Sequence, residues 1–225
     1  MKPKKLIAYK GSMSAADIAS GINAAIANGK RLADDAELLL NAGRFPSAAS
    51  IAALSIEESG KVSILRQLAT AQTQEGISAA WKAYRSHTSK NSQWLLPDLA
   101  RQGARKLDDL KPLFSPDAEH PFLLDQLKQL GFYTDCLGKK HWSAPIDVID
   151  ESLARSLVQT AKLLVGKREV TTEEIELWIE HVGSTEGTDP DNMRRGLINW
   201  YAAMQQRKLL PAGRNEMERF INEGV

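Results

Sequence analysis

Residues 43–71 read GRFPSAASIAALSIEESGKVSILRQLATA and predict one long helix. Pro46 lies where proline is tolerated, in the first turn, and the helical pattern continues to about Ala71. On a helical wheel of about 100° per residue, the large aliphatic side chains fall within one arc, and serines, Arg66 and Gln67 occupy the other side. The apolar arc contains Ile51, Leu54, Val62, Ile64, Leu65 and Leu68. We expect this arc to pack against other helices.

Three charged residues of this helix, Glu57, Glu58 and Lys61, fall inside the apolar arc. Burying an unpaired charge is strongly unfavourable, so we predict that they form a mutually compensated polar site in the core or at a cleft. Polar sites of this kind are built in the cores of helical bundles. The alternative is a surface pair between Glu57 and Lys61, which would stabilise the helix by only about 0.2–0.5 kcal/mol.

Helical periodicity dominates the other parts of the chain as well, and no convincing alternation predicts a strand. Ser14 and Asp17 resemble a capping box in front of a helix at Ala15–Asn41. Residues 132–146 show no clear period and are expected to form an ordered loop. The further expected helices cover residues 75–88, 92–110 with an interruption near Pro97, 116–131 behind a Ser115-Pro116 cap, 148–165, 172–182, 190–208 and 215–222.

These elements predict an all-α protein in three parts. We expect an amino-terminal tail at residues 1–13, a helical bundle at 14–146, and a carboxyl-terminal helical extension at 147–225 packed on the bundle. The many large apolar side chains of the last part are too numerous to remain in water, which is why we expect it to pack.

Composition excludes several classes of protein. With 43% hydrophobic residues among 225, the chain is able to bury a core and is not disordered. A net charge of +1 argues against coating nucleic acid by bulk charge but allows a local basic site. The single cysteine, Cys136, fits a reducing compartment. No stretch is long and apolar enough for a signal peptide or a membrane span, so we expect a cytoplasmic protein with no membrane partner.

A second set of candidate site residues lies at the carboxyl-terminal end of the helix expected at 75–88. His87 could transfer protons because imidazole titrates near neutral pH. Arg85 and Lys90 could bind phosphate, the first as a fork and the second as a point charge. The alternative is a solvated basic helix end, and spacing alone leaves both open. The histidines and the cysteine lack metal-ligand spacing, and no phosphate-binding loop is present, so we expect no metal and no cofactor.

Four blocks of the sequence resemble the AbiV-type abortive-infection family. They are NGKRLADDAELLLNAGR at 28–44, GRFPSAASIAALSIEESGK at 43–61, YRSHTSK at 84–90 and LGFYTDCLGKKHWSAP at 130–145. The resemblance implies a HEPN-like helical bundle, usually dimeric, that defends bacteria against phage. Many HEPN proteins are metal-independent ribonucleases with a site between two protomers and an arginine followed, after four to six residues, by a histidine. This signature is absent, since one residue separates Arg85 from His87.

Two hypotheses for function follow. On the first, the protein cleaves RNA or inhibits translation, and RNA is its partner; on the second, it is a non-catalytic interaction protein that binds a phage or host protein. We also expect a homodimer with the charged faces of the helices at 46–71 and 75–88 near its two-fold axis. The catalytic hypothesis assigns His87 as acid or base, Glu57 or Glu58 as its orienter or a second base, and Lys61, Arg85 and Lys90 as phosphate stabilisers.

Overall fold

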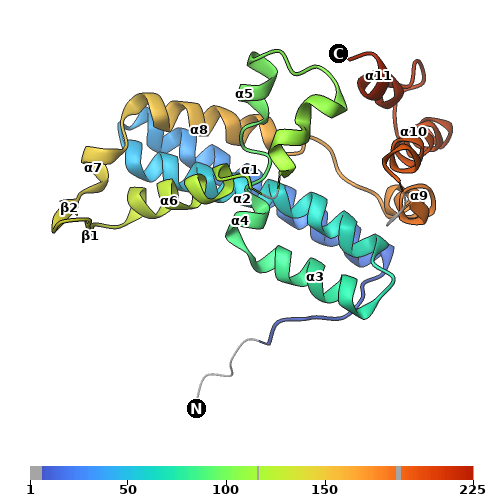
Figure 1. Ribbon diagram of the computed structural model, residues 1–225, viewed down its shortest axis with the longest axis horizontal. Coiled ribbons are helices and arrows are strands. Elements are labelled where there is room, and N and C mark those ends of the chain that lie inside the picture. The colour runs from blue at the N-terminus through green and yellow to red at the C-terminus, as the bar shows by residue number, and fades with distance from the viewer. Residues whose placement is uncertain (1–6, 116, 186–188, 225) are drawn as a thin grey trace.

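The computed structural model describes residues 7–115, 117–185 and 189–224 and is an all-α bundle with one small β-hairpin (Figure 1). Its centre is an antiparallel pair, α1 (Ala15–Asn41) and α2 (Phe45–Thr70). The predicted capping box opens α1, because the Ser14 hydroxyl accepts from the Asp17 amide at 3.1 Å and the Asp17 carboxylate accepts from the Ser14 amide at 3.1 Å. The predicted all-α fold and the bounds of these two helices are confirmed.

Helix α2 is surrounded by other helices on most sides, and its serine side is only partly exposed, since Ser63 and Gln67 reach solvent. Ser55 is fully buried, and its hydroxyl donates to the Gly29 carbonyl oxygen of α1 at 2.7 Å. The first half of the helix carries alanines that allow close packing with α1 and α8 (Glu151–Leu164). A helix that is surrounded by others has no single apolar face, so a wheel with two sides does not describe it.

Two glycines bring neighbouring helices unusually close to α2. A Cβ atom on Gly60 would lie 2.0 Å from the carbonyl oxygen of Lys90 in α4 (His87–Lys90). A Cβ atom on Gly131 of α6 (His120–Phe132) would lie 2.2 Å from the Ser50 hydroxyl of α2, which donates to the Lys128 carbonyl oxygen at 3.1 Å. These contacts hold α4 and α6 against α2 on either side of Glu57.

The helix expected at 75–88 ends earlier than predicted. Helix α3 covers Gln74–Arg85, and Ser86 then acts as the amino-terminal cap of α4, its hydroxyl accepting from the Ser89 amide at 3.2 Å. His87 is therefore the first residue of a new helix, which changes its direction relative to Arg85.

The region between α4 and α6 is less helical than predicted. The helical stretch expected at 92–110, with an interruption near Pro97, is only partly helical: α5 covers Leu96–Arg101, and a 3₁₀ helix, η1, covers Leu107–Phe114. Pro97 lies in the first turn of α5 rather than interrupting a helix, as the fixed φ of proline favours. Helix α6 begins at His120, later than expected, and Pro116 of the predicted cap lies outside the described residues.

The loop expected at 132–146 contains a β-hairpin. Strands β1 (Asp135–Leu137) and β2 (His141–Ser143) pair antiparallel, with Cys136 opposite Trp142. Strands of three residues are too short to show an alternating pattern, which is why the sequence did not reveal them. The short helix α7 (Pro145–Val148) follows, and the hairpin and α7 lie together at one end of the molecule (Figure 1).

The last four helices continue the bundle and then extend it. Helix α8 starts after an Asp150 cap, and its side chains join the main core with those of α1 and α2. Helices α9 (Thr172–His181), α10 (Pro190–Gln206) and α11 (Glu216–Asn222) gather at the other end of the molecule, with a 3₁₀ turn, η2 (Gly183–Thr185), after α9 (Figure 1). The domain boundary at residue 146 stays a prediction, although α8 beyond it packs within the main core.

No helix in the described part of the chain combines the length and apolar character that crossing a membrane would require.

Candidate functional site

A buried carboxylate, Glu57 of α2, lies at the centre of the densest charged cluster. Its side chain is 5% exposed and contacts groups from two other helices. Lys128 Nζ of α6 lies 2.5 Å from Oε1, while His87 Nδ1 and Lys90 Nζ of α4 lie 2.7 and 3.3 Å from Oε2. The prediction that Glu57 is buried and compensated is confirmed, but its partners are not those expected.

Lys128 links Glu57 to a second carboxylate. The Lys128 ammonium, 5% exposed, also donates to Asp125 Oδ1 at 2.7 Å, and it lies 3.4 Å from His87 Nδ1. Lys128 and Asp125 are three residues apart and therefore lie on the same side of α6. We call Glu57, His87, Lys90, Asp125 and Lys128 the α2–α4–α6 cluster.

The charges of this cluster stabilise one another. Burial alone would raise the pKa of Glu57, but hydrogen bonds from Lys128 and His87 and the positive charges of Lys128 and Lys90 lower this pKa below its ordinary value. Burial alone would lower the pKa of Lys128, but Asp125 and Glu57 raise it above its ordinary value. Both groups are therefore charged at neutral pH.

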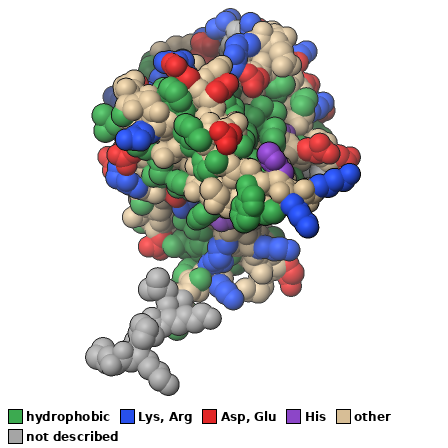
Figure 2. Space-filling view, turned by 90° about the vertical axis from the view of Figure 1, so that its left-hand side faces the viewer, with side chains coloured by type: hydrophobic (Ala, Val, Ile, Leu, Met, Phe, Trp, Pro, Cys, Tyr) green, Lys and Arg blue, Asp and Glu red, His purple; other side chains and the backbone are tan. Residues whose placement is uncertain are grey.

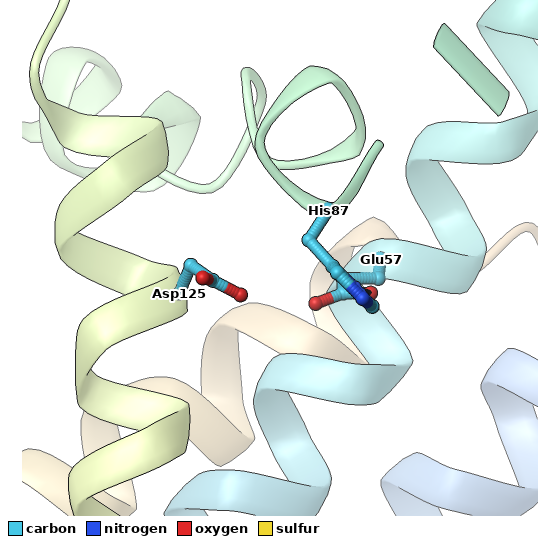
Figure 3. A group of neighbouring side chains, drawn as sticks. All are labelled: Glu57, His87 and Asp125. Carbon is cyan, nitrogen blue, oxygen red and sulfur yellow. Dashed lines mark hydrogen bonds and ion pairs between the residues drawn. The ribbon is translucent and has the colours of Figure 1, made fainter. Parts of the chain in front are cut away.

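His87 is the most exposed member of the cluster. Its side chain is 56% exposed, and Figure 3 shows it converging with Glu57 and Asp125 from three separate helices. Because the charged Glu57 carboxylate can only accept a hydrogen bond, this contact favours a hydrogen on Nδ1, and in the neutral imidazole Nε2 is then the acceptor. Nε2 has no hydrogen-bond partner among the residues that the structure describes. A carboxylate that orients an imidazole in this way is a common arrangement for acid–base chemistry.

Three members of the cluster could also hold a metal ion. Glu57, His87 and Asp125 each offer a ligand atom, and these atoms lie within 4.8 Å of one another. However, the Lys128 ammonium contacts both carboxylates and supplies the positive charge that a metal would otherwise bring. A metal ion would have to displace this ammonium in order to bind both acids.

Glu58 and Lys61 form a separate pair outside the cluster. Lys61 Nζ lies 2.6 Å from Glu58 Oε1, and the side chains are 18% and 16% exposed. Lys61 also lies 5.2 Å above the ring centre of Tyr84. The surface pair between Glu57 and Lys61 that the sequence left open is wrong, because each residue has a different partner.

Arg85 turns away from the cluster. Its guanidinium lies 5.0 Å from the Trp81 ring centre and donates to the carbonyl oxygens of Trp81 and Tyr9. Of the six candidate residues, the structure therefore brings Glu57, His87 and Lys90 together and places Glu58, Lys61 and Arg85 elsewhere.

Asp125 and Lys128 were not predicted from the sequence as site residues. A signal was available for Lys128, since it lies four residues after Leu124 and therefore on the same face of α6 as this fully buried side chain. A charged residue on an apolar helix face is the same signal that identified Glu57.

Comparison with known proteins supports the resemblance found in the sequence. The family model HEPN_AbiV, described as AbiV, matches residues 17–166, which is more than half of the chain and includes the whole α2–α4–α6 cluster. No curated protein and no solved structure matches the chain significantly. The predicted resemblance and the HEPN-like bundle are confirmed.

Proposed function

The chain belongs to the AbiV family of HEPN proteins, and from this premise we propose that it is a bacterial abortive-infection protein that cleaves RNA without a metal ion. The observation that carries the proposal is the 2.7 Å contact between Glu57 and Nδ1 of an exposed imidazole. His87 is then the catalytic acid or base, and Glu57 and Lys128 are positioning residues that hold its tautomer and orientation.

The proposed reaction needs only groups that the protein and the RNA supply. His87 Nε2 accepts the proton of a ribose 2′-hydroxyl, and the 2′-oxygen forms a bond to the adjacent phosphorus. The bond from phosphorus to the 5′-oxygen breaks, and this oxygen takes a proton from a second acid. The products are a 2′,3′-cyclic phosphate and a 5′-hydroxyl.

A second protomer would complete this site. Lys90 and Lys128 are engaged with Glu57 and Asp125, so they do not offer free charge to a phosphate. In the homodimer expected from the family, a second copy of His87 would supply the acid, and cations of the second chain would stabilise the charge that develops on the phosphate. Dimer formation and RNA binding are both part of this proposal.

The test is cleavage of tRNA, rRNA and mRNA by the purified protein, with and without a chelator. We expect cleavage that persists in the chelator, is lost in His87→Ala, and is strongly reduced in Glu57→Gln. His141→Ala is the matched control, because His141 lies on the hairpin strand β2 and is exposed. Undiminished cleavage by His87→Ala would refute the assignment.

A second candidate function is binding of a phage or host protein without catalysis. The observation that favours it is a set of exposed apolar side chains at the hairpin end, including Tyr133, Trp142 and Ile146, which are 62–71% exposed. Figure 2 faces this end and shows apolar side chains spread between charged ones. Exposed apolar surface of this kind is typical of protein interaction sites.

Infection experiments separate the two functions. If His87→Ala protects cells fully from phage and shows no nuclease activity, binding is the mechanism. A pull-down during infection with wild type and Trp142→Ala then tests whether the hairpin end captures the partner. Loss of protection in His87→Ala with retained partner capture supports catalysis instead.

A further inference from the structure

A cavity of about 450 Å³ lies between α1, α2, the segment after α8, and α9, and it shares no residue with the α2–α4–α6 cluster. Helix α2 contributes to both sites from opposite sides, since Arg66 lies nine residues after Glu57 and thus about 180° around the helix. Arg66 lines the cavity together with Lys167, Arg168 and Trp178.

The charge of this cavity is positive. Three cations line it, and no carboxylate is found among its described lining residues. The nearest compensating charge is Glu174 of α9, which is fully buried and accepts from Arg66 at 2.5 Å and from Arg168 at 2.6 Å. One carboxylate against three cations leaves an excess of two positive charges, and Lys167 has no ion-pair partner in the described part of the chain.

The Arg66 side chain and the backbone of the segment after α8 are held in place before any ligand binds. The Arg66 guanidinium lies 5.0 Å from the ring centre of Trp178 and 5.1 Å from that of Trp200, and these two rings meet edge to face. Asn23 of α1 fixes the segment after α8 through two hydrogen bonds of 2.9 Å to the backbone of Val170. A wall that is already ordered loses little conformational freedom when it binds a ligand.

The cavity also presents apolar surface to a ligand. Ile26, Val62 and the Trp178 ring form an apolar wall, which a bare inorganic anion would leave unused.

We propose that this cavity binds a nucleoside monophosphate. The excess of two positive charges matches a phosphate monoester, which carries close to two negative charges at neutral pH. The apolar wall and Trp178 fit a planar base, and Gln93, which also lines the cavity, offers an amide that can donate to and accept from a base edge. A volume of about 450 Å³ lies in the range of small-ligand sites.

The proposal is tested by titrating the protein with each of the four common nucleoside 5′-monophosphates. Binding is measured by tryptophan fluorescence and by calorimetry. Parallel titrations use the matching nucleosides and inorganic phosphate. We expect at least one nucleotide to bind, and to bind about tenfold or more tightly than its nucleoside and than phosphate, because a charge-assisted contact contributes about this much. Equal affinity for inorganic phosphate, or no nucleotide binding at millimolar concentration, would overturn the proposal.

Lys167→Gln is the most informative variant, because Lys167 is exposed and its loss leaves no buried partner uncompensated. We expect about a tenfold loss of nucleotide affinity with an unchanged melting temperature. Arg155→Gln on α8, which removes an exposed cation paired with Glu151, is the matched control and should bind like wild type. Undiminished affinity in Lys167→Gln combined with Arg168→Gln would also overturn the proposal. His87→Ala should bind the nucleotide normally, so failure of this site and failure of the proposed RNA cleavage are distinguishable.

Discussion

Replacing Lys128 by methionine should destabilise the protein more than any change at Glu58 or Lys61. Lys128 is 5% exposed and bonds both Glu57 and Asp125, so its removal leaves Glu57, also 5% exposed, without its shortest ionic contact. Breaking one partner of a buried ion pair costs about 3–5 kcal/mol, because the remaining charge stays desolvated. For a chain of this length, that loss corresponds to a fall in melting temperature of roughly 6–20 °C.

The measurement is urea and thermal unfolding followed by circular dichroism. Lys162→Met is the matched control, because it removes the same ammonium from a pair with Glu37 whose side chains are 44% and 43% exposed. We expect the control to lose at most about 1 kcal/mol. In the double variant Glu57→Gln with Lys128→Met, the two losses should be less than additive, since the second change removes the charge that the first leaves unpaired. If Lys128→Met lies within about 0.5 kcal/mol of wild type, the cluster is not buried as described and the reasoning fails.

Three further predictions concern pH, metal ions and assembly. The pKa of Glu57 is lowered in the folded protein, so the stabilisation by Glu57 is present above the ordinary pKa of 4.5 and is lost as the pH falls through the folded pKa. Glu57→Gln should therefore lose less stability than wild type over this acid range. Identical acid-unfolding curves for the two proteins would contradict this prediction. The pKa of Lys128 is raised, so its stabilisation is complete below 10.5 and is lost as the pH rises through the folded value. Lys128→Ala should bind Zn²⁺ more tightly than wild type in calorimetry, because Glu57, His87 and Asp125 would no longer hold an ammonium, and equal affinity would show that Lys128 does not occupy the site. Light scattering at micromolar concentration should find twice the 24.8 kDa chain mass, and a strict monomer would remove the shared site from the proposed mechanism.

Local features of the sequence were enough to place the two central helices. The Ser14 capping box, the positive φ of Gly43 and the first-turn Pro46 act within a few residues of the helix ends that they define. Such short-range interactions do not depend on how the chain folds elsewhere. The same reasoning failed on both sides of α6, at residues 91–115 and 133–146, where short helices and three-residue strands are stabilised mainly by their neighbours.

At the candidate site, the sequence pattern was enough to predict that Glu57 is a charge on a helix that packs in the core, and that His87 is a candidate acid or base. The packing of distant helices, which no local pattern reveals, pairs Glu57 with Lys128, 71 residues away, and with His87, which Ser86 redirects by starting a new helix. The same packing places the far side of α2 along a basic cavity. The physical reason is that a helix wheel predicts which side chains leave water, whereas the partner of a buried charge depends on which distant helix can approach closely, here through the backbone space at Gly60 and Gly131.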